Sequence, residues 1–197
     1  MKFFKEITNL PQVPTDLLDR PLEKKVVAPG SRRTYKKDGR FIATSTYEFN
    51  PVKENNVDLH DWITSNIYPG CNNTYKIRIH QDYGSSINGP HTDRVRMLAL
   101  NYYWDLGGSS VNTVWYRYKD KSKPIYVGEK HYPNYDKLEI LETATLKTNT
   151  WYLLNVGVIH SVENIEASRK YLSLSYWRED KHLLDRETID WFNNSTK

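Results

Sequence analysis

The segment Gly89-Pro90-His91-Thr92-Asp93 constrains the fold of this chain more than any other feature of the sequence. On an extended backbone, side chains two residues apart point to the same side, so His91 and Asp93 would face one point in space. A second histidine ends the segment Asn155-Val-Gly-Val-Ile-His160 and can come from a neighbouring strand. Two histidines and one carboxylate can hold one face of an octahedral iron(II) and leave the opposite face open to small molecules. The pattern therefore predicts a metal site on a β-scaffold.

Length and composition favour one β-rich domain. The 197 residues suit one domain with extensions, because a domain takes roughly 150 residues. The chain contains 15 Tyr, 6 Trp and 5 Phe, and aromatic and β-branched side chains are enriched in strands. Cys71 is the single cysteine, so an internal disulfide and a cysteine-based zinc site are excluded. We therefore expect one domain over residues 1–197 and a cytoplasmic location.

The basic residues are concentrated near the N-terminus. The net charge is +4, and residues 20–40 carry eight basic residues against Glu23 and Asp38, which gives +6 for this arm and −2 for the rest. We interpret the arm as a solvated basic surface. The functional alternative is attraction of an anionic partner such as nucleic acid, or folding over the metal site. No apolar run forms a signal peptide or reaches the roughly 18 residues of a membrane span, so we expect no membrane contact.

Hydrophobic periodicity predicts a series of short strands and a helix. Residues 1–55 have only short apolar patches, so we expect an irregular basic arm with one or two edge strands. Helical spacing predicts a helix over residues 57–68 before Pro69-Gly70, and a second helix in the tail 180–197. Strands are expected over residues 75–80, 95–104, 111–118, 138–146, 151–156, 158–163 and 170–177. Together they predict a sandwich or barrel over residues 57–177.

Two connections matter for the site. The turn-rich stretch from Asp82 to Pro90 is expected to be a loop that leads into His91. Residues 119–136 are rich in Lys, Tyr and Pro and are expected to form a long surface connection, with a lid over a site as the alternative.

Four segments occur in one order along the chain: His91-Thr-Asp93, Arg96-Met-Leu-Ala-Leu-Asn-Tyr-Tyr-Trp-Asp-Leu-Gly107-Gly108, His160-Ser-Val162 and Arg169-Lys-Tyr-Leu-Ser-Leu-Ser-Tyr-Trp177. In residue type and order they resemble the iron(II)- and 2-oxoglutarate-dependent oxygenases, within them the prolyl-hydroxylase-like branch. The resemblance covers about residues 75–177 and leaves the N-terminal arm and the C-terminal tail unmatched. The residues after Gly108 depart from the family pattern, so the substrate-facing loops cannot be transferred.

The resemblance implies a double-stranded β-helix, or jelly roll, with a few flanking helices. Iron(II) would be bound by His91, Asp93 and His160 at its open end. Arg169 would bind the distal carboxylate of the cosubstrate 2-oxoglutarate, since a guanidinium can neutralise a carboxylate through two hydrogen bonds inside a narrow barrel. Arg169 also alternates with the apolar residues of a strand, and an arginine in such a place calls for a buried anion.

Further side chains are candidates around this centre. Candidate contacts to 2-oxoglutarate are Asn101, Tyr103 and Tyr75. Candidates for orienting a metal ligand or binding the substrate are His80, Tyr83, Arg94 and Arg96. For the two arginines, a solvated or ion-paired surface position is the alternative.

The implied reaction consumes O2 and 2-oxoglutarate, releases succinate and CO2 and hydroxylates an unactivated C–H bond. The substrate implied is an amino acid, a peptide or a protein side chain, prolyl or similar. Two other functions use the same residues, a non-catalytic jelly-roll binding module and a zinc-dependent hydrolase. A binding module needs neither the full ligand set nor Arg169, and the sequence shows no evident glutamate general base for hydrolysis.

Overall fold

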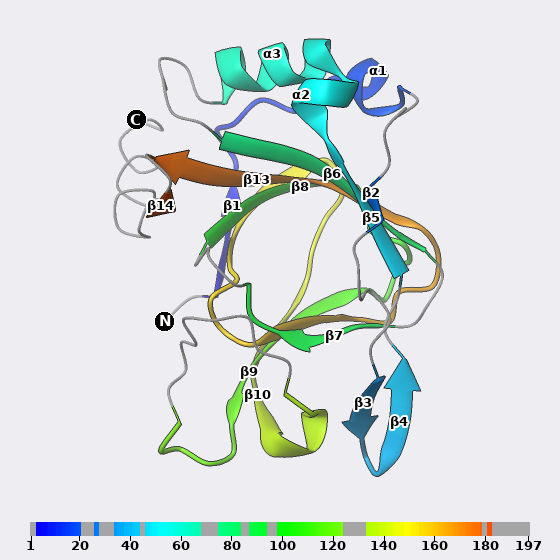
Figure 1. Ribbon diagram of the computed structural model, residues 1–197, viewed down its shortest axis with the longest axis vertical. Coiled ribbons are helices and arrows are strands. Elements are labelled where there is room, and N and C mark those ends of the chain that lie inside the picture. The colour runs from blue at the N-terminus through cyan, green and yellow to red at the C-terminus, as the bar shows by residue number, and fades with distance from the viewer. Residues whose placement is uncertain are drawn as a thin grey trace.

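A computed structural model describes residues 3–20, 26–27, 34–43, 46–67, 75–83, 87–93, 98–123, 133–178 and 181–182. Figure 1 shows two sheets that face each other, helices along the outer side of the larger sheet, and a small hairpin beside the smaller one. All strand pairs are antiparallel in the described residues. The mainly β fold class is confirmed.

The larger sheet has eight strands and the smaller sheet four. In spatial order, the larger sheet contains β1 (Phe4–Ile7), β11 (Thr150–Asn155), β8 (Leu98–Asp105), β13 (Arg169–Arg178), β6 (Tyr75–Tyr83), β5 (Thr46–Pro51) and β2 (Val26–Val27), and β14 (Lys181–His182) pairs with β13. The smaller sheet contains β10 (Leu138–Thr145), β9 (Asn112–Tyr118), β12 (His160–Glu163) and β7 (Ile87–His91).

The core strands alternate between the two sheets as the chain proceeds, except that β9 and β10 follow each other within the smaller sheet. Strands β6, β8, β11 and β13 lie in the larger sheet, and β7, β9, β10 and β12 lie in the smaller one. Their spatial orders are β11-β8-β13-β6 and β10-β9-β12-β7. This winding of antiparallel strands across two facing sheets is the double-stranded β-helix, or jelly roll, so the predicted architecture is confirmed.

The N-terminal region contributes more regular structure than the expected irregular arm. Strand β1 pairs with β11 through Phe4 and Leu154, and β5 pairs with β6 through Phe49 and His80. The two segments extend opposite edges of the larger sheet. An edge strand left open exposes unpaired backbone groups, and these pairings cover both edges of the four-stranded core.

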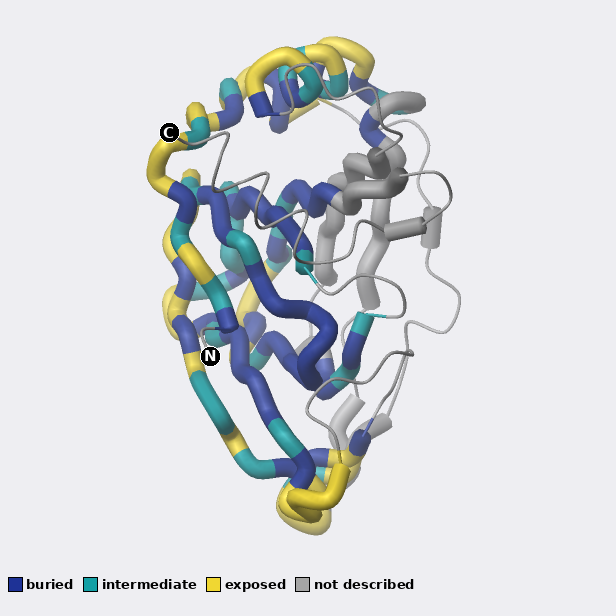
Figure 2. The backbone as a smooth tube through the Cα atoms, turned by 90° about the vertical axis from the view of Figure 1, so that its left-hand side faces the viewer, coloured by how far each residue is buried: buried dark blue, intermediate teal, exposed yellow. Residues whose placement is uncertain are grey.

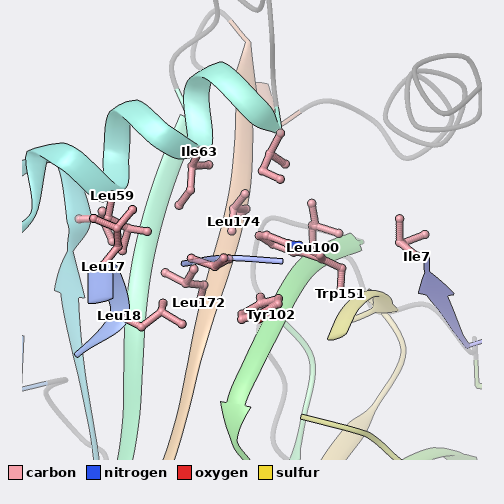
Figure 3. Close-up of a cluster of buried hydrophobic side chains, with 13 residues drawn as sticks. Ile7, Leu17, Leu18, Leu59, Ile63, Leu100, Tyr102, Trp151, Leu172 and Leu174 are labelled. Carbon is pink, nitrogen blue, oxygen red and sulfur yellow. The ribbon is translucent and has the colours of Figure 1, made fainter. Parts of the chain in front are cut away.

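The outer face of the larger sheet is buried by three short helices, α1 (Thr15–Leu18), α2 (Val52–Asn55) and α3 (Val57–Asn66). Leu59 and Ile63 of α3 are fully buried and belong to one hydrophobic cluster with Leu172 and Leu174 of β13 (Figure 3). Asn56 caps α3, because its side-chain oxygen accepts from the Leu59 N–H at 3.0 Å. The helix predicted over residues 57–68 is confirmed.

The inner faces of the sheets enclose a second core. Strand β8 shows the alternation directly, because Tyr102 packs with the helices whereas Ala99 and Tyr103 pack with Trp115 of β9. Asn101 lies two residues from both Ala99 and Tyr103 along β8, so its side chain is on the same inner face of the sheet. Figure 2 shows buried segments through the middle of the molecule, with exposed residues gathered at the helical end and at the opposite end.

The expected strands are found with small changes in their bounds, and one prediction was wrong. The stretch before His91 was expected to be a loop, but Ile87–His91 forms β7 and pairs with β12. Gly89 and Pro90 are tolerated there because β7 is an edge strand, where a proline removes no ladder hydrogen bond on its open side.

Two other expectations are tested only in part. The helix expected in the tail 180–197 and most of the connection 119–136 lie outside the described residues, apart from β14, residues 119–123 and a 3-10 turn at Tyr135–Lys137. None of the described helices has the length and apolarity that a membrane crossing requires.

A hairpin from the basic arm docks on the outer face of the smaller sheet. Strands β3 (Thr34–Lys37) and β4 (Arg40–Ala43) are joined by Asp38 and Gly39, which both have positive φ, as a tight two-residue hairpin requires. The Lys37 ammonium lies 3.1 Å from a carboxylate oxygen of Glu163 on β12 and 4.8 Å from the centre of the Tyr135 ring. At least this lysine of the arm therefore binds an internal anion.

Glu163 is the centre of a small polar network behind the metal-facing side of β12. Its carboxylate accepts hydrogen bonds from Tyr116 at 2.5 Å, Ser161 at 3.1 Å and Lys37 at 3.1 Å. Burial raises the pKa of Glu163, but the hydrogen bonds from Tyr116 and Lys37 outweigh it, so the pKa lies below its ordinary value. Burial and the Glu163 carboxylate both raise the pKa of the Tyr116 phenol. The network therefore holds an ionised carboxylate and a neutral phenol.

Replacing Glu163 by Gln should lower stability in a pH-dependent way. Because the folded-state pKa is depressed, the carboxylate stabilises the protein above its unfolded-state pKa of about 4.3, and this contribution is lost as the pH falls through the folded-state pKa. We expect the Tm difference between wild type and Glu163→Gln to be largest near neutral pH and to shrink as the pH falls below about 4.3 and through the folded-state pKa, as measured by thermal melts followed by circular dichroism.

Lys36→Met is the matched control. Lys36 lies in the same hairpin as Lys37 and forms an exposed ion pair with Asp136 at 3.9 Å. Such exposed pairs contribute little to stability. Its Tm should stay near that of wild type across the range. A Glu163→Gln difference that is constant with pH would contradict the ionised network.

Candidate metal centre

His91, Asp93 and His160 come together at one end of the interior. His91 is the last residue of β7, His160 is the first residue of β12, and the two are direct partners in the antiparallel register. Each of the three residues offers one ligand atom, and these atoms all lie within 4.8 Å of one another. The ring centroids of the two histidines are 4.4 Å apart. The structure therefore assembles the three residues that the sequence singled out.

Backbone carbonyls orient both imidazole rings. His91 Nδ1 lies 2.8 Å from the carbonyl oxygen of Gly89, and His160 Nδ1 lies 2.9 Å from that of Val158. A carbonyl can only accept, so Nδ1 carries the hydrogen in each bond and the ligating lone pair of the neutral ring is on Nε2. A bond of this kind is what usually orients a metal-bound histidine. His91 Nε2 faces Asp93 Oδ1 at 3.7 Å.

The donor set and spacing fit a divalent metal. Neighbouring ligand atoms on one octahedral face, each about 2.1 Å from the ion, are about 3.0 Å apart. His91 Nε2 and Asp93 Oδ1 are 3.7 Å apart and all three ligand atoms lie within 4.8 Å, so the side chains would have to draw together around a bound ion. Two imidazoles and one carboxylate are the ligands of the facial iron(II) triad, which leaves the other coordination positions open.

Arg169 is buried inside the same barrel. It is the first residue of β13 and only 2% exposed. Its guanidinium lies 4.9 Å from the centre of the Tyr103 ring and 4.5 Å from that of Tyr171. The two aromatic faces stabilise the cation and hold it on the inner side of the sheet.

Asn101 and Tyr103 extend this polar region along β8. Asn101 Nδ2 donates to the Tyr103 hydroxyl oxygen at 2.9 Å, so the phenolic hydrogen is directed to another acceptor. Asn101 is 5% exposed, and its Oδ1 has no hydrogen-bond partner among the described residues. A buried amide oxygen without a donor costs about 1–3 kcal/mol, which favours a bound molecule or water at this place. Asn101, Tyr103 and Arg169 thus form one buried polar strip.

The glycine pair at the end of β8 supports Arg169 from behind. Gly107 has φ +76°, and a Cβ there would lie 2.8 Å from the Ala167 carbonyl oxygen and 3.0 Å from Arg169 Cβ. The Gly107 carbonyl accepts the N–H groups of Glu166 and Ala167, both at 2.8 Å. The turn therefore packs directly against the segment that leads into Arg169, and no larger residue fits.

The remaining candidate residues are separated by the strand register. Tyr75 pairs with Tyr176, whereas Asp82 pairs with Arg169. Tyr75 thus lies seven residues along the sheet from Arg169, or about 23 Å at the rise of a strand, and its assignment as a contact to the same small dicarboxylate is wrong. Tyr83 follows Asp82 and lies at the correct end of β6.

The other candidates are placed only in part. His80 pairs with Tyr171 by backbone register. Its side chain is outside the described part, as are those of Tyr75 and Tyr83. Arg94 and Arg96 lie outside the described residues altogether. The roles assigned to His80, Tyr83, Arg94 and Arg96 therefore stay predictions.

Two aromatic residues near the site were not expected from the sequence. Trp115 is the cross-strand partner of His160. Phe4, from the N-terminal arm, stacks on Trp115 with a centroid distance of 5.6 Å. The sequence carries no local signal for this contact, because 111 residues separate the two rings and nothing in either segment specifies the pairing.

No family model and no curated protein matches the chain. Solved structures with a similar trace include an oxidoreductase of the 2OG-Fe(II) oxygenase family from Burkholderia pseudomallei, with 11% identity, a TM-score of 0.47 and coverage of 85% of this chain and 78% of that one. Escherichia coli ribosomal oxygenase YcfD gives 12% identity and a TM-score of 0.45 over 98% of this chain and 57% of its own. Bacillus subtilis oxalate decarboxylase gives 11% identity and a TM-score of 0.36, with coverage of 72% of this chain and 27% of that one. At these values the likeness assigns neither a family nor an activity.

Replacing Gly107 by Ala should destabilise the protein and disturb Arg169. A non-glycine residue at this φ costs about 1–3 kcal/mol, and the added Cβ also meets the Ala167 carbonyl oxygen at 2.8 Å. Urea denaturation measures the loss.

Gly39→Ala is the matched control for this change. Gly39 has φ +75°, but a Cβ added there would have nothing within 4 Å, so this variant reports the backbone cost without the clash. Gly107→Ala should therefore lose clearly more stability than Gly39→Ala. Equal losses would show that the close approach to Arg169 is absent.

Proposed function

We propose that this chain is an iron(II)- and 2-oxoglutarate-dependent dioxygenase that hydroxylates an unactivated C–H bond of an amino-acid, peptide or protein side chain. The observation that carries the proposal is the coexistence of two features inside one barrel. One is the His91, Asp93 and His160 cluster, with both rings oriented for ligation through Nε2. The other is the buried guanidinium of Arg169 beside Tyr103.

Each part of the polar strip has a role in holding the dicarboxylic cosubstrate. Arg169 binds the distal carboxylate through its planar donors, and the Tyr103 hydroxyl, which already accepts from Asn101, donates to the same carboxylate. Tyr103 of the strip belongs to the same buried apolar cluster as Trp115 and Tyr152. In the proposed reaction this packing would shield the reactants from water, and the chain's own groups would hold them in place for the metal.

Bound iron(II) supplies the oxidative step, in which O2 and 2-oxoglutarate give succinate and CO2 and one oxygen atom enters the substrate C–H bond. The chain's own residues bind and orient. The reaction needs no general base, and the cluster of described residues around the metal position contains no second carboxylate beside Asp93.

The two alternative functions explain fewer of these features. Zinc-dependent hydrolysis requires a base to activate water, and it leaves the buried Arg169 without a role. A binding module has no need for imidazole rings oriented toward one point. The proposed oxygenase uses both the metal-ligand cluster and Arg169.

Anaerobic titration with iron(II) and then 2-oxoglutarate tests the proposal. We expect the weak visible charge-transfer band of the iron chelate in wild-type protein and no band in His160→Ala. Arg169→Met should weaken 2-oxoglutarate binding by about 10-fold or more, since bonds to charged groups contribute about 1.5–3 kcal/mol, while Mn(II) affinity stays within about threefold. Succinate release in the presence of O2 and candidate peptides or amino acids then identifies the substrate.

Arg117→Met is the matched control for the charge change. Arg117 is a partly exposed arginine on β9 that pairs with Glu139, so its loss removes a guanidinium without touching the polar strip. It should leave the chelate band unchanged. Absence of the band in wild type, or an unchanged band in Arg169→Met, would refute the proposed cosubstrate site.

A further inference from the structure

We infer that Trp115, together with the N-terminal Phe4 that stacks on it, is a positioning element for the metal ligands Asp93 and His160. This inference rests on the metal site of the proposed function and assigns residues outside the ligand set to it. It also gives the first residues of the chain a place in the active centre.

Three backbone groups of the neighbouring residues Asn155 and Val156 tie this element to the ligands. The Asn155 N–H donates to the Phe3 carbonyl at 2.8 Å, and the Trp115 indole N–H donates to the Asn155 carbonyl at 2.8 Å. The next carbonyl, that of Val156, accepts the N–H of Asp93 at 2.9 Å. One short segment thus joins the N-terminal strand, the indole and a metal ligand.

The same segment leads directly into the second histidine. His160 lies four residues after Val156 and is the cross-strand partner of Trp115 in the β12–β9 ladder. Trp115 is therefore held next to His160 by the backbone and holds the segment behind Asp93 by its side chain. A shift of the indole would move both ligands relative to each other.

Aromatic stacking fixes the indole from the other side. The Phe4 ring lies 5.6 Å from Trp115 at an interplanar angle of 9°, and the Phe3 ring lies at 6.1 Å and 23°. Strand β1 places Phe4, because Phe4 pairs with Leu154, the residue before Asn155, and the Phe3 carbonyl is bound by the Asn155 N–H. Trp115 is fully buried, so the indole has no water to replace a lost partner, and the stack and hydrogen bond restrain it together.

Trp151 offers a matched comparison within the same molecule. It is 1% exposed against 0% for Trp115, and its indole N–H also donates to a backbone carbonyl, that of Pro11, at 2.8 Å. It packs on the outer face with the helices, in the cluster away from the metal ligands. Replacing either tryptophan by Phe removes one buried indole hydrogen bond, and only Trp115 adjoins the metal centre.

The experiment compares Trp115→Phe with Trp151→Phe. Both variants should lose a similar amount of Tm. Isothermal titration with Mn(II) should show binding at least about 10-fold weaker for Trp115→Phe, the loss typical when a group supporting a metal ligand is removed, and within about twofold of wild type for Trp151→Phe.

Phe4→Leu is a milder second variant that keeps the β1 pairing and removes the stacked ring. Should Trp115→Phe not fold, Phe4→Leu carries the test, with Mn(II) binding expected about three- to fivefold weaker than wild type. Mn(II) affinities in Trp115→Phe, or in Phe4→Leu as its replacement, that match Trp151→Phe would overturn the positioning role and leave the metal site intact. Wild-type protein that binds no Mn(II) would instead overturn the metal site itself, and this inference with it.

Discussion

The cross-strand pairing of His91 with His160 is the constraint on which the rest of the site depends. His91 ends β7 and His160 begins β12. The two residues are 69 positions apart in the chain, and the β7–β12 ladder places them directly opposite each other. A slip of one residue in either strand would turn one histidine to the outer face of the sheet. Within each segment the Nδ1 bonds to Gly89 and Val158 orient the rings locally, and the Asp93 N–H bond to the Val156 carbonyl joins the same two parts of the chain.

The two faces of the larger sheet show why the interior is a site and not merely a core. The outer face carries Leu172, Leu174 and their helical partners, with apolar contacts throughout. The inner face carries Asn101 and Arg169, both buried. Burying such groups is costly unless they are satisfied. The Asn101 amide oxygen has no hydrogen-bond partner among the described residues, so this inner face, unlike the outer one, is a candidate position for a bound molecule.

Sequence patterns predicted those parts that rest on local spacing. His91 and Asp93 share a side because they are two apart, and the helix before Pro69 follows its own periodicity. Strand β7 was missed because Gly89 and Pro90 resemble a turn, and an edge strand tolerates them. Tyr75 was misplaced because its distance from Arg169 depends on the β6–β13 register, which no local pattern reveals. The Phe4 contact with Trp115 is likewise set by the pairing of distant strands.

In the proposed function, one divalent ion and one dicarboxylate occupy the barrel together. Anomalous diffraction from crystals grown anaerobically with Mn(II) and 2-oxoglutarate would locate both. We expect a single strong peak about 2.1 Å from Nε2 of His91, Nε2 of His160 and a carboxylate oxygen of Asp93, with the distal carboxylate of 2-oxoglutarate at Arg169. An ion bound by other residues, or a dicarboxylate that does not reach Arg169, would contradict it.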